Sequence, residues 1–217
     1  MSILGKIKQK VLHLKTRTDY KNMLAEIESY GQIEGWLTDN EAYGLYATAR
    51  RLPPGSKIVE IGSWQGKSTY CLAKGLRNGE VFAIDPFDAS GEPSSEATYQ
   101  QLKGNKPLFE KFQDNMQRLG VSEKVVALAG YSNQFVGVVS NIDFLFIDGD
   151  HSVEGCAYDF TNFSPLLKKG GYLAFHDYFP NRPDLGPTWV ITQQVLPSGD
   201  YEFIGCFDSL WVARKKA

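Results

Sequence analysis

A buried strand that leads into a glycine turn and a helix constrains the fold of this chain more than any other feature. Residues 59–68 have the sequence VEIGSWQGKS, in which glycines at 62 and 66 follow an apolar strand. A second apolar strand, residues 81–85, ends in the acid Asp85. This order is typical of open α/β sheets, which bind ligands at the carboxyl ends of their parallel strands. We therefore expect a ligand site at that edge.

The glycine turn also limits the kind of ligand. Dinucleotide-binding turns have a glycine two residues after the first one, because bare backbone must approach a pyrophosphate. Trp64 occupies that position here, between Gly62 and Gly66. The turn therefore favours an adenosine ligand without phosphates, with S-adenosylmethionine as the candidate, and argues against a nicotinamide-dependent oxidoreductase.

Strand and helix patterns alternate from residue 57 onward. Continuous apolar runs such as 144–147 indicate strands covered by helices on both sheet faces, and right-handed crossovers then give a doubly wound sheet. The tail contains two short strands, 201–206 and 209–213, separated by Phe207 and Asp208, which predicts a hairpin. The predicted core elements are strands at 57–61, 81–85, 124–129, 142–148 and 171–176, and helices at 66–77, 106–119, 132–139 and 153–168. The predicted fold class is α/β: a doubly wound, mostly parallel seven-stranded sheet with a C-terminal antiparallel hairpin.

The N-terminal part differs in character from the core. We predict a helical extension at 1–51 that packs on a core at 52–217, with two helices in 20–51 and cap candidates Asp39 and Asn40 for the second. Residues 1–17 are basic and amphipathic. We expect them to form a solvated helix that packs on this domain or on a partner chain, as in a homo-oligomer; contact with an anionic membrane surface is the alternative.

Composition excludes several classes of protein. The net charge is −2, so nothing draws the chain to nucleic acid. No apolar run approaches the roughly 18 residues that a transmembrane helix needs. The three cysteines are far apart in the sequence, which indicates reduced thiols and a cytoplasmic location.

Three sequence pieces at strand ends carry a family resemblance: residues 59–63 (VEIGS), 147–151 (IDGDH) and 170–178 (GGYLAFHDY). With them the chain resembles class I S-adenosylmethionine-dependent O-methyltransferases, in the branch related to macrocin O-methyltransferase and more distantly to catechol O-methyltransferase. The resemblance covers about residues 35–214. It implies a Rossmann-like methyltransferase fold and transfer of a methyl group to a hydroxyl of a small molecule: a sugar, a glycan or glycosylated metabolite, or a phenol.

The resemblance assigns the cofactor to the turns after the first strands. Glu60 would organise the glycine turn and the methionine amine, and Trp64 would lie near the sulfonium, where a ring face contributes about 0.5–2 kcal/mol. Asp85 would accept from the ribose hydroxyls, although it also suits a turn before Pro86. The turn at 130–132 would contact adenine, or Ser132 would only cap a helix. The predicted cofactor residues are Glu60, Gly62, Ser63, Trp64, Gly66, Ser68, Asp85, Gly130, Tyr131, Ser132 and Asp148.

Methyl transfer requires an aligned nucleophile that loses its proton. In the metal-dependent relatives the positions of Asp148, His176 and Asp177 hold Mg²⁺ or a similar divalent ion. His176 departs from the usual oxygen donors, since imidazole suits transition metals better. The alternative is that His176 and Asp177 form a hydrogen-bonded pair that caps the strand end.

Two residues are candidates for the base. We name His151 first and Asp150 second, with helix capping by Asp150 or Ser152 as the alternative. Two polar loops, 88–105 and 179–188, are expected to shape an acceptor pocket, or to be simple connectors; the pocket would include Tyr178, Phe179 and Trp189. A degenerate cofactor-binding or protein-interaction module without turnover is the competing hypothesis.

Overall fold

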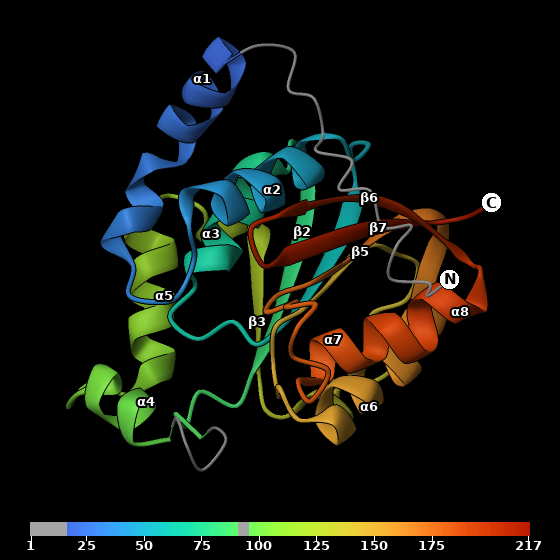
Figure 1. The fold of residues 1–217 in the computed structure, drawn as a ribbon. Coiled ribbons are helices and arrows are strands. Elements are labelled where there is room, and N and C mark those ends of the chain that lie inside the picture. The colour runs from blue at the N-terminus through green and yellow to red at the C-terminus, as the bar shows by residue number, and fades with distance from the viewer. Residues whose placement is uncertain (1–16, 91–95) are drawn as a thin grey trace.

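The structure is a computed structural model that describes residues 17–90 and 96–217. Its centre is one seven-stranded sheet in the order β3-β2-β1-β4-β5-β7-β6, in which β1 to β5 are parallel and β7 and β6 are antiparallel (Figure 1). The predicted doubly wound sheet and terminal hairpin are confirmed. The strands are β1 (Ser56–Ile61), β2 (Gly79–Asp85), β3 (Val125–Ala129), β4 (Ile142–Ile147), β5 (Leu167–Phe175), β6 (Tyr201–Phe207) and β7 (Leu210–Lys215).

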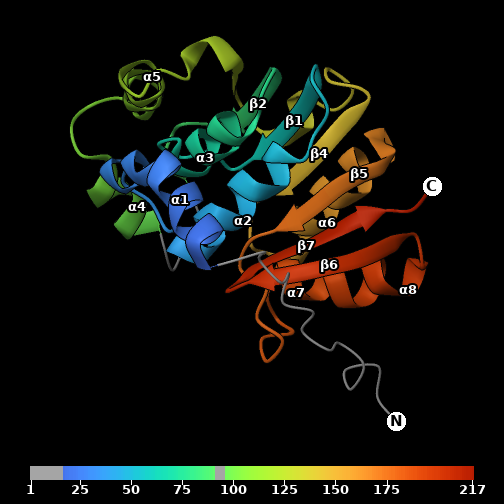
Figure 2. The same ribbon diagram turned by 90° about the horizontal axis from the view of Figure 1, so that it is seen from above.

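Helices cover both faces of the sheet, as the continuous apolar strands predict. Figure 2 shows α1 to α5 on one side of the sheet and α6 to α8 on the other. The α-helices are α1 (Arg17–Ile27), α2 (Asp39–Arg50), α3 (Lys67–Gly75), α4 (Glu96–Lys103), α5 (Leu108–Arg118), α6 (Val153–Phe163), α7 (Gly186–Val190) and α8 (Leu196–Ser198). Single turns of 3₁₀-helix occur at η2 (Glu28–Gln32), η3 (Ser122–Lys124), η4 (Ser132–Gln134) and η5 (Ser164–Leu166), and η6 (Ile191–Val195) is a π-helical turn.

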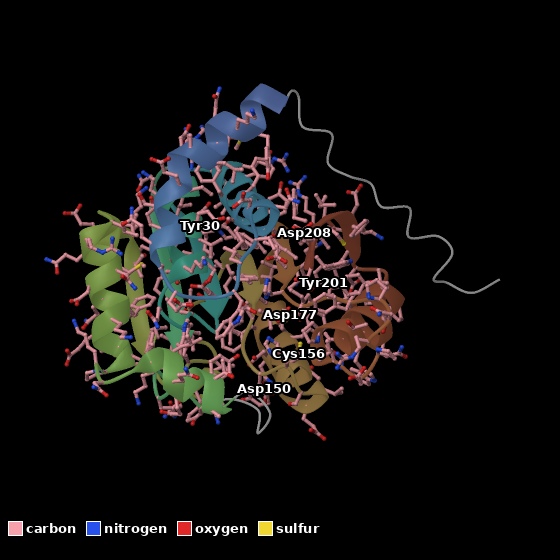
Figure 3. All side chains as sticks on the ribbon, turned by 60° about the vertical axis from the view of Figure 1, so that its left-hand side comes forward. Tyr30, Asp150, Cys156, Asp177, Tyr201 and Asp208 are labelled. Carbon is pink, nitrogen blue, oxygen red and sulfur yellow. The ribbon has the colours of Figure 1, made fainter. Side chains whose placement is uncertain are left out.

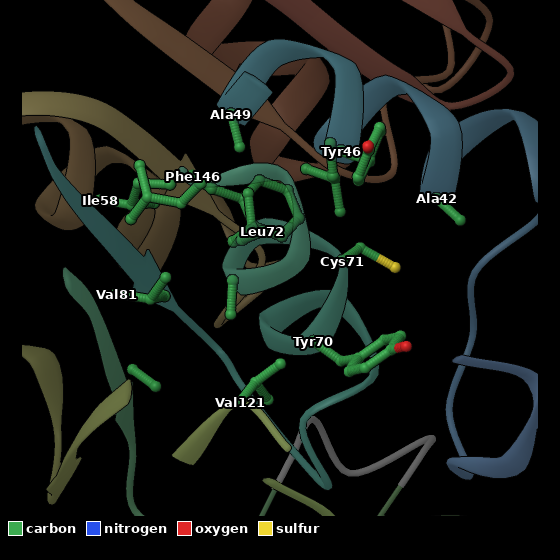
Figure 4. Close-up of a cluster of buried hydrophobic side chains, with 14 of the residues drawn as sticks. Ala42, Tyr46, Ala49, Ile58, Tyr70, Cys71, Leu72, Val81, Val121 and Phe146 are labelled. Carbon is green, nitrogen blue, oxygen red and sulfur yellow. The ribbon is translucent and has the colours of Figure 1, made fainter. Parts of the chain in front are cut away.

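Successive strand residues point to opposite faces, so the sheet separates two apolar cores. Ile58 and Phe146 belong to the core under α2 and α3, which Figure 4 shows in close-up. Val59 and Leu145 belong to the core under α6 and η6. Because both faces are filled, functional side chains can gather only at the strand ends.

The N-terminal helices are packed tightly against the core and the hairpin. A side chain at Gly44 of α2 would overlap Phe207 and Leu210, with its Cβ 2.7 Å and 2.9 Å from them. Thr38 Oγ1 also donates to Asp208 in the hairpin turn, at 2.7 Å. Residues 1–16 lie outside the described part of the chain, so both expectations for the basic segment stay predictions.

Several predicted boundaries were wrong. Thr38, rather than Asp39 or Asn40, caps α2, because its hydroxyl accepts from Glu41 N while Glu41 accepts from Thr38 N. The hairpin turn is 208–209, one residue later than expected, since Phe207 pairs with Leu210. The loop expected at 88–105 contains α4, the loop at 179–188 runs into α7, and the helix at 132–139 is only one 3₁₀ turn.

Within the part of the chain that the structure describes, no helix is both long enough and apolar enough to cross a membrane.

Candidate active site

A cavity of about 1040 Å³ opens at the carboxyl ends of the central strands. The turns after β1, β2, β3, β4 and β5 all line it, together with residues 35–37 and the start of α4. Ligand pockets typically measure about 300–1,000 Å³, so this cavity is large enough for two small molecules side by side. The sequence correctly predicted the edge on which it lies.

Asp85 holds the glycine turn in place. Its Oδ2 accepts the backbone N–H groups of Ser63 and Trp64 at 2.9 Å and 2.8 Å, and its Oδ1 accepts that of Phe87 at 2.7 Å. Trp64 has φ +48°, a left-handed conformation that is costly for a bulky residue and is found mainly at functional sites. Asp85 therefore has the turn-forming role, and it also lines the cavity.

Glu60 lies beneath the same turn and outside the cavity lining. Its side chain is fully buried and accepts hydrogen bonds from the hydroxyls of Ser63, at 3.1 Å, and Thr69. Burial raises the pKa of Glu60 to about 7, against the lowering by the hydroxyls of Ser68, Thr69 and Ser63. Glu60 thus organises the turn from below, and its contact with the methionine amine stays a prediction.

The two glycines of the turn have reasons within the protein itself. A Cβ at Gly62, where φ is +90°, would lie 2.1 Å from the backbone oxygen of Asp148 on the neighbouring strand turn. A Cβ at Gly66, where φ is +91°, would lie 2.5 Å from Met116 of α5, and Gly66 does not line the cavity. Gly62 therefore allows the turns after β1 and β4 to meet, whereas Gly66 is favoured by its left-handed φ, because the Met116 methyl group is the end of a flexible side chain.

Two histidines and two aspartates form a cluster at the ends of β4 and β5. His176 Nδ1 lies 3.2 Å from Asp148 Oδ1 and 3.4 Å from Asp177 Oδ2. His151 Nε2 lies 3.2 Å from Asp177 Oδ2 and 3.7 Å from Asp148 Oδ1. Burial opposes ionisation of Asp148, but the two imidazoles outweigh it and lower the pKa of this acid. The structure therefore brings together four residues that the sequence placed at one edge.

Glu41, which the sequence analysis did not identify, completes the cluster from α2. Its Oε2 lies 3.3 Å from His176 Nε2, and its Oε1 accepts from the backbone N–H of Ser209 at 3.0 Å and from the Ser209 hydroxyl at 2.6 Å. Burial alone would raise the pKa of Glu41, but His176, Ser209 and Thr38 outweigh it and lower the pKa to about 2. Burial likewise disfavours a charged His176, yet Asp148, Asp177 and Glu41 raise its pKa. An ionised pair thus links the N-terminal helices to the site.

The possible metal donors differ from the predicted set in one residue. Asp148, His151 and Asp177 offer ligand atoms that all lie within 4.8 Å of one another. His176, the predicted third ligand, is 5% exposed and lies between Glu41 and the two aspartates. Sequence spacing could not distinguish the two histidines, because each lies next to an aspartate near a strand end. His151 follows Asp150, and His176 precedes Asp177.

Asp150 and Ser152 both serve the start of α6. Asp150 Oδ1 accepts from Ser152 N at 2.7 Å, and the Ser152 hydroxyl accepts from Gly155 N at 3.0 Å, which makes Ser152 the helix cap. Asp150 also lines the cavity, and Figure 3 shows it on the same side of the molecule as Asp177. Of the two capping alternatives considered from the sequence, Ser152 is the one that caps α6, while Asp150 holds the N–H of this cap residue.

The turn after β3 lies where the sequence placed it. Gly130, Tyr131 and Ser132 all line the cavity. The Tyr131 hydroxyl donates to Asp88 Oδ2 at 3.0 Å, and the Ser132 hydroxyl donates to Asp159 Oδ1 at 2.6 Å. Ser132 is the first residue of the 3₁₀ turn η4, whose N-cap is Tyr131, and the Ser132 hydroxyl is directed to Asp159.

Three aromatic rings form one wall of the cavity. Tyr99 of α4 lies with its ring centroid 5.2 Å from both Trp36 and Trp64. Trp36, on the N-terminal extension, is 52% exposed. The sequence analysis missed Trp36 and Tyr99, since neither follows a core strand; the tryptophan next to Gly35 was the available signal in the sequence.

The aromatic residues expected around the acceptor lie elsewhere. Tyr178, Phe179 and Trp189 are absent from the residues that line the cavity. Tyr178 is buried in the core under α6, Phe179 points to solvent, and Trp189 packs against that same core. This prediction was wrong because the segment after β5 turns back under the sheet into α7.

The fold matches that of known methyltransferases. A sequence model of the methyltransferase domain family matches residues 59–178, more than half of the chain, and the chain belongs to this family. It is 28% identical over 159 residues to the uncharacterized protein R132 of Acanthamoeba polyphaga mimivirus, covering 69% of this chain and 66% of that protein, slightly less than two thirds of its length.

Two solved structures illustrate the fold. The O-methyltransferase NovP is 14% identical with a TM-score of 0.65, over 92% of this chain and 99% of NovP. The O-methyltransferase TomG from Streptomyces achromogenes, involved in tomaymycin synthesis and solved with S-adenosylmethionine, is 17% identical with a TM-score of 0.59, over 95% and 93% of the two chains. At these identities the likeness establishes the shared Rossmann-like methyltransferase architecture.

Proposed function

We propose that this methyltransferase takes its methyl group from S-adenosylmethionine and transfers it to a hydroxyl of a small molecule. The observation that carries the proposal is the His151 imidazole, which lies 3.2 Å from Asp177 in a cavity whose other half has a turn suited to an adenosyl ligand. The resemblance to the macrocin O-methyltransferase branch supports the choice of oxygen as the acceptor atom.

The residues of the turn fit a ligand without phosphates. Lys67 is the only lysine or arginine among the described residues that line the cavity, and its ammonium donates to the backbone oxygen of Gly35 at 2.8 Å. No cation is thus directed at a pyrophosphate. Asp85 Oδ1 accepts a single backbone hydrogen bond and has acceptor capacity for a ribose hydroxyl. The Trp64 ring would lie beside the sulfonium, where a cation is favoured.

The chemistry requires alignment and removal of one proton, because the sulfonium already activates the methyl carbon. His151 is the group that would accept the proton of the acceptor hydroxyl, with Asp177 orienting the imidazole and stabilising its charged form. Asp150 is less suited to this role, since it is occupied at the start of α6.

The donors Asp148, His151 and Asp177 also suit a divalent cation. Two carboxylates and one imidazole fit manganese or another transition metal better than magnesium, which prefers oxygen ligands. When bound, such an ion would lower the pKa of a hydroxyl next to it. A bound ion would take the lone pair of the His151 imidazole, so we propose metal assistance on this donor set as the alternative to base catalysis by His151, and chelation by EDTA distinguishes the two.

The same cavity offers an acceptor both apolar surface and carboxylates. Trp36 and Tyr99 offer flat apolar surface, while Asp88 and Asp177 offer hydrogen-bond acceptors. Sugars and phenols both present hydroxyl donors and a face that packs on rings. We propose a sugar, a glycan or a glycosylated metabolite first and a phenol second.

The proposal is tested in two stages. Calorimetry should first detect binding of S-adenosylmethionine, and no binding would end the enzyme hypothesis. Consumption of the cofactor is then followed against sugars, nucleotide sugars and catechols, with Mg²⁺, Mn²⁺ or EDTA present.

Once an acceptor is found, His151→Ala should lower turnover by about 10²–10⁴-fold, the usual contribution of a general base. Cofactor affinity should remain within about twofold, because His151 lies outside the turn that holds the adenosyl group. The exposed Glu154→Ala is the matched control. Full turnover by the His151 variant would show that the base lies elsewhere.

A further inference from the structure

Asp177, which lies 3.2 Å from the proposed base His151, has an uncommon backbone conformation. Its φ is +56°, in the left-handed region that residues other than glycine enter at a cost in conformational energy. Such a conformation persists only where the surrounding structure fixes it. Asp177 orients the imidazole in the proposed chemistry, so its own position must be fixed by other contacts.

Both residues that flank Asp177 are tied to a single side chain, that of Glu41 on α2. On the N-terminal side, His176 Nε2 lies 3.3 Å from Glu41 Oε2. On the C-terminal side, the backbone N–H of Tyr178 donates to the backbone oxygen of Ser209 at 3.0 Å. Ser209 in turn donates its own N–H and its hydroxyl to Glu41 Oε1. Glu41 thus closes a ring of contacts around Asp177.

The imidazole of His176 also connects Glu41 to the Asp177 carboxylate. His176 Nδ1 lies 3.4 Å from Asp177 Oδ2, the same oxygen that lies 3.2 Å from His151 Nε2. Only 7% of the His176 side chain and 4% of the Glu41 side chain are exposed, so water competes little for these contacts. The contacts therefore run in one line from α2 to the proposed base.

Glu41 is itself held firmly enough to fix its neighbours. Its Oε2 accepts the backbone N–H of Thr38 at 2.8 Å in the capping box of α2, and its Oε1 has the two donors of Ser209. Building on His151 as the proposed base, we propose that Glu41 is a positioning residue for the reaction. It fixes the carboxylate of Asp177, and that carboxylate holds the imidazole of His151 in place. Helix α2 is then part of the catalytic machinery.

A purely structural Glu41 would give a different result on mutation. If Glu41 only joins α2 to the hairpin, its loss lowers stability and leaves the turnover of the folded enzyme unchanged. If Glu41 positions the base, its loss lowers kcat. Cofactor binding should stay the same in either case, because Asp85 holds the glycine turn independently.

The test is the turnover of Glu41→Gln, with calorimetric binding of S-adenosylhomocysteine as the check that the variant is folded. The amide keeps the shape of the side chain but has only one oxygen, which cannot serve Ser209 and also the donors at Oε2. We expect kcat to fall about 10- to 100-fold, as for a misplaced catalytic group, while KM for S-adenosylmethionine stays within about twofold. Unchanged kcat would overturn the inference.

Thr38→Ala is the matched control. It removes the hydroxyl that caps the same helix and donates to Asp208, but it keeps the backbone N–H that contacts Glu41. Its kcat should stay within about twofold of wild type. A loss as large as that of Glu41→Gln would show that any weakening of this helix end slows the enzyme, and the inference would fail.

A double-mutant cycle identifies the route of the effect. Because Glu41 acts through His151, Glu41→Gln should lower the residual kcat of His151→Ala by less than about twofold. The full 10- to 100-fold loss in both backgrounds would overturn the inference and leave the base assignment intact. Full turnover by His151→Ala would overturn the base assignment together with the inference, and absence of cofactor binding would overturn the proposed function as a whole.

Ser209→Ala provides a second variant if Glu41→Gln does not fold. It removes the hydroxyl that lies 2.6 Å from Glu41 Oε1 and keeps the backbone groups that contact Glu41 and Tyr178. We expect kcat to fall about 3- to 10-fold, which corresponds to one lost hydrogen bond. This loss should also disappear in the His151→Ala background. A kcat equal to that of wild type would contradict the positioning role.

Discussion

Two buried glutamates lie on the two halves of the same sheet edge, and their environments shift their pKa values in opposite directions. Glu60, under the turn after β1, is surrounded by hydroxyls, and burial raises its pKa to about 7. Glu41, on α2, faces His176 and Ser209, which lower its pKa to about 2 despite burial. Neutral hydrogen-bond donors satisfy a buried acid but compensate desolvation less than a neighbouring cation does.

The opposite pKa shifts of Glu60 and Glu41 reflect two different kinds of interaction that hold the two halves of the site together. In the cofactor half, consecutive residues of one turn are held by a single acid, Asp85, through backbone N–H groups. In the histidine half, side chains from α2, the ends of β4 and β5, and the hairpin turn hold one another through charge. The first half depends on local sequence, and the second depends on the folded chain.

Removal of the Glu41 side chain should have the largest effect on stability. Glu41→Ala leaves Nε2 of the buried His176 without a carboxylate partner and leaves two donors of Ser209 unpaired, which should cost about 3–5 kcal/mol of unfolding free energy. Urea denaturation at pH 7 measures this loss. A loss below about 1 kcal/mol would mean that charge does not hold the histidine half together. The exposed Glu123→Ala is the control.

Glu60 should produce a pH dependence of stability. Its pKa is about 7 in the folded state and about 4.3 when unfolded, so the folded state retains a proton that the unfolded chain has lost between these values. Wild-type stability therefore falls as the pH rises through this range. Glu60→Gln has no such proton. Its unfolding free energy relative to wild type should rise by about 3 kcal/mol between pH 4.5 and 7.5, at about 1.4 kcal/mol per pKa unit.

Glu41 provides the comparison for that profile. Its folded pKa is lowered, so its contribution is complete above about pH 4.5 and declines as the pH falls toward about 2. Glu41→Gln, measured in EDTA, should therefore be less stable than wild type at neutral pH and approach wild-type stability in acid. The stability of Glu60→Gln relative to wild type should instead increase toward neutral pH. Parallel profiles for the two variants would contradict the opposite charge states.

Sequence patterns predicted the half that depends on local structure. The glycine turn, the acid ending β2 and the turn after β3 were all placed at the correct edge, because strand order and side-chain alternation fix where strand ends meet. The Thr38–Glu41 spacing is a capping-box signal that could have marked Glu41 as a first-turn residue. Its contact with His176 follows only from how α2 packs against β5 and the hairpin, so pattern alone could not reveal it.

The smallest predicted effect concerns which half of the site contacts the positively charged sulfonium of the cofactor. Trp64 lies in the cofactor half and packs against Trp36 and Tyr99. If its ring faces the sulfonium, Trp64→Leu should weaken binding of S-adenosylmethionine more than binding of the uncharged S-adenosylhomocysteine. The difference should be about 0.5–2 kcal/mol, the range for a cation over an aromatic ring, and calorimetry of both ligands measures it.

Trp64→Phe is the matched variant, because it keeps an aromatic face in the same strained turn and should keep most of the difference. Equal weakening of both ligands by Trp64→Leu would assign the ring to packing alone. The carboxylates of Asp148 and Asp177 would then stabilise the sulfonium charge. In that case both halves of the sheet edge would bind the cofactor, and the histidine half would not be reserved for the acceptor.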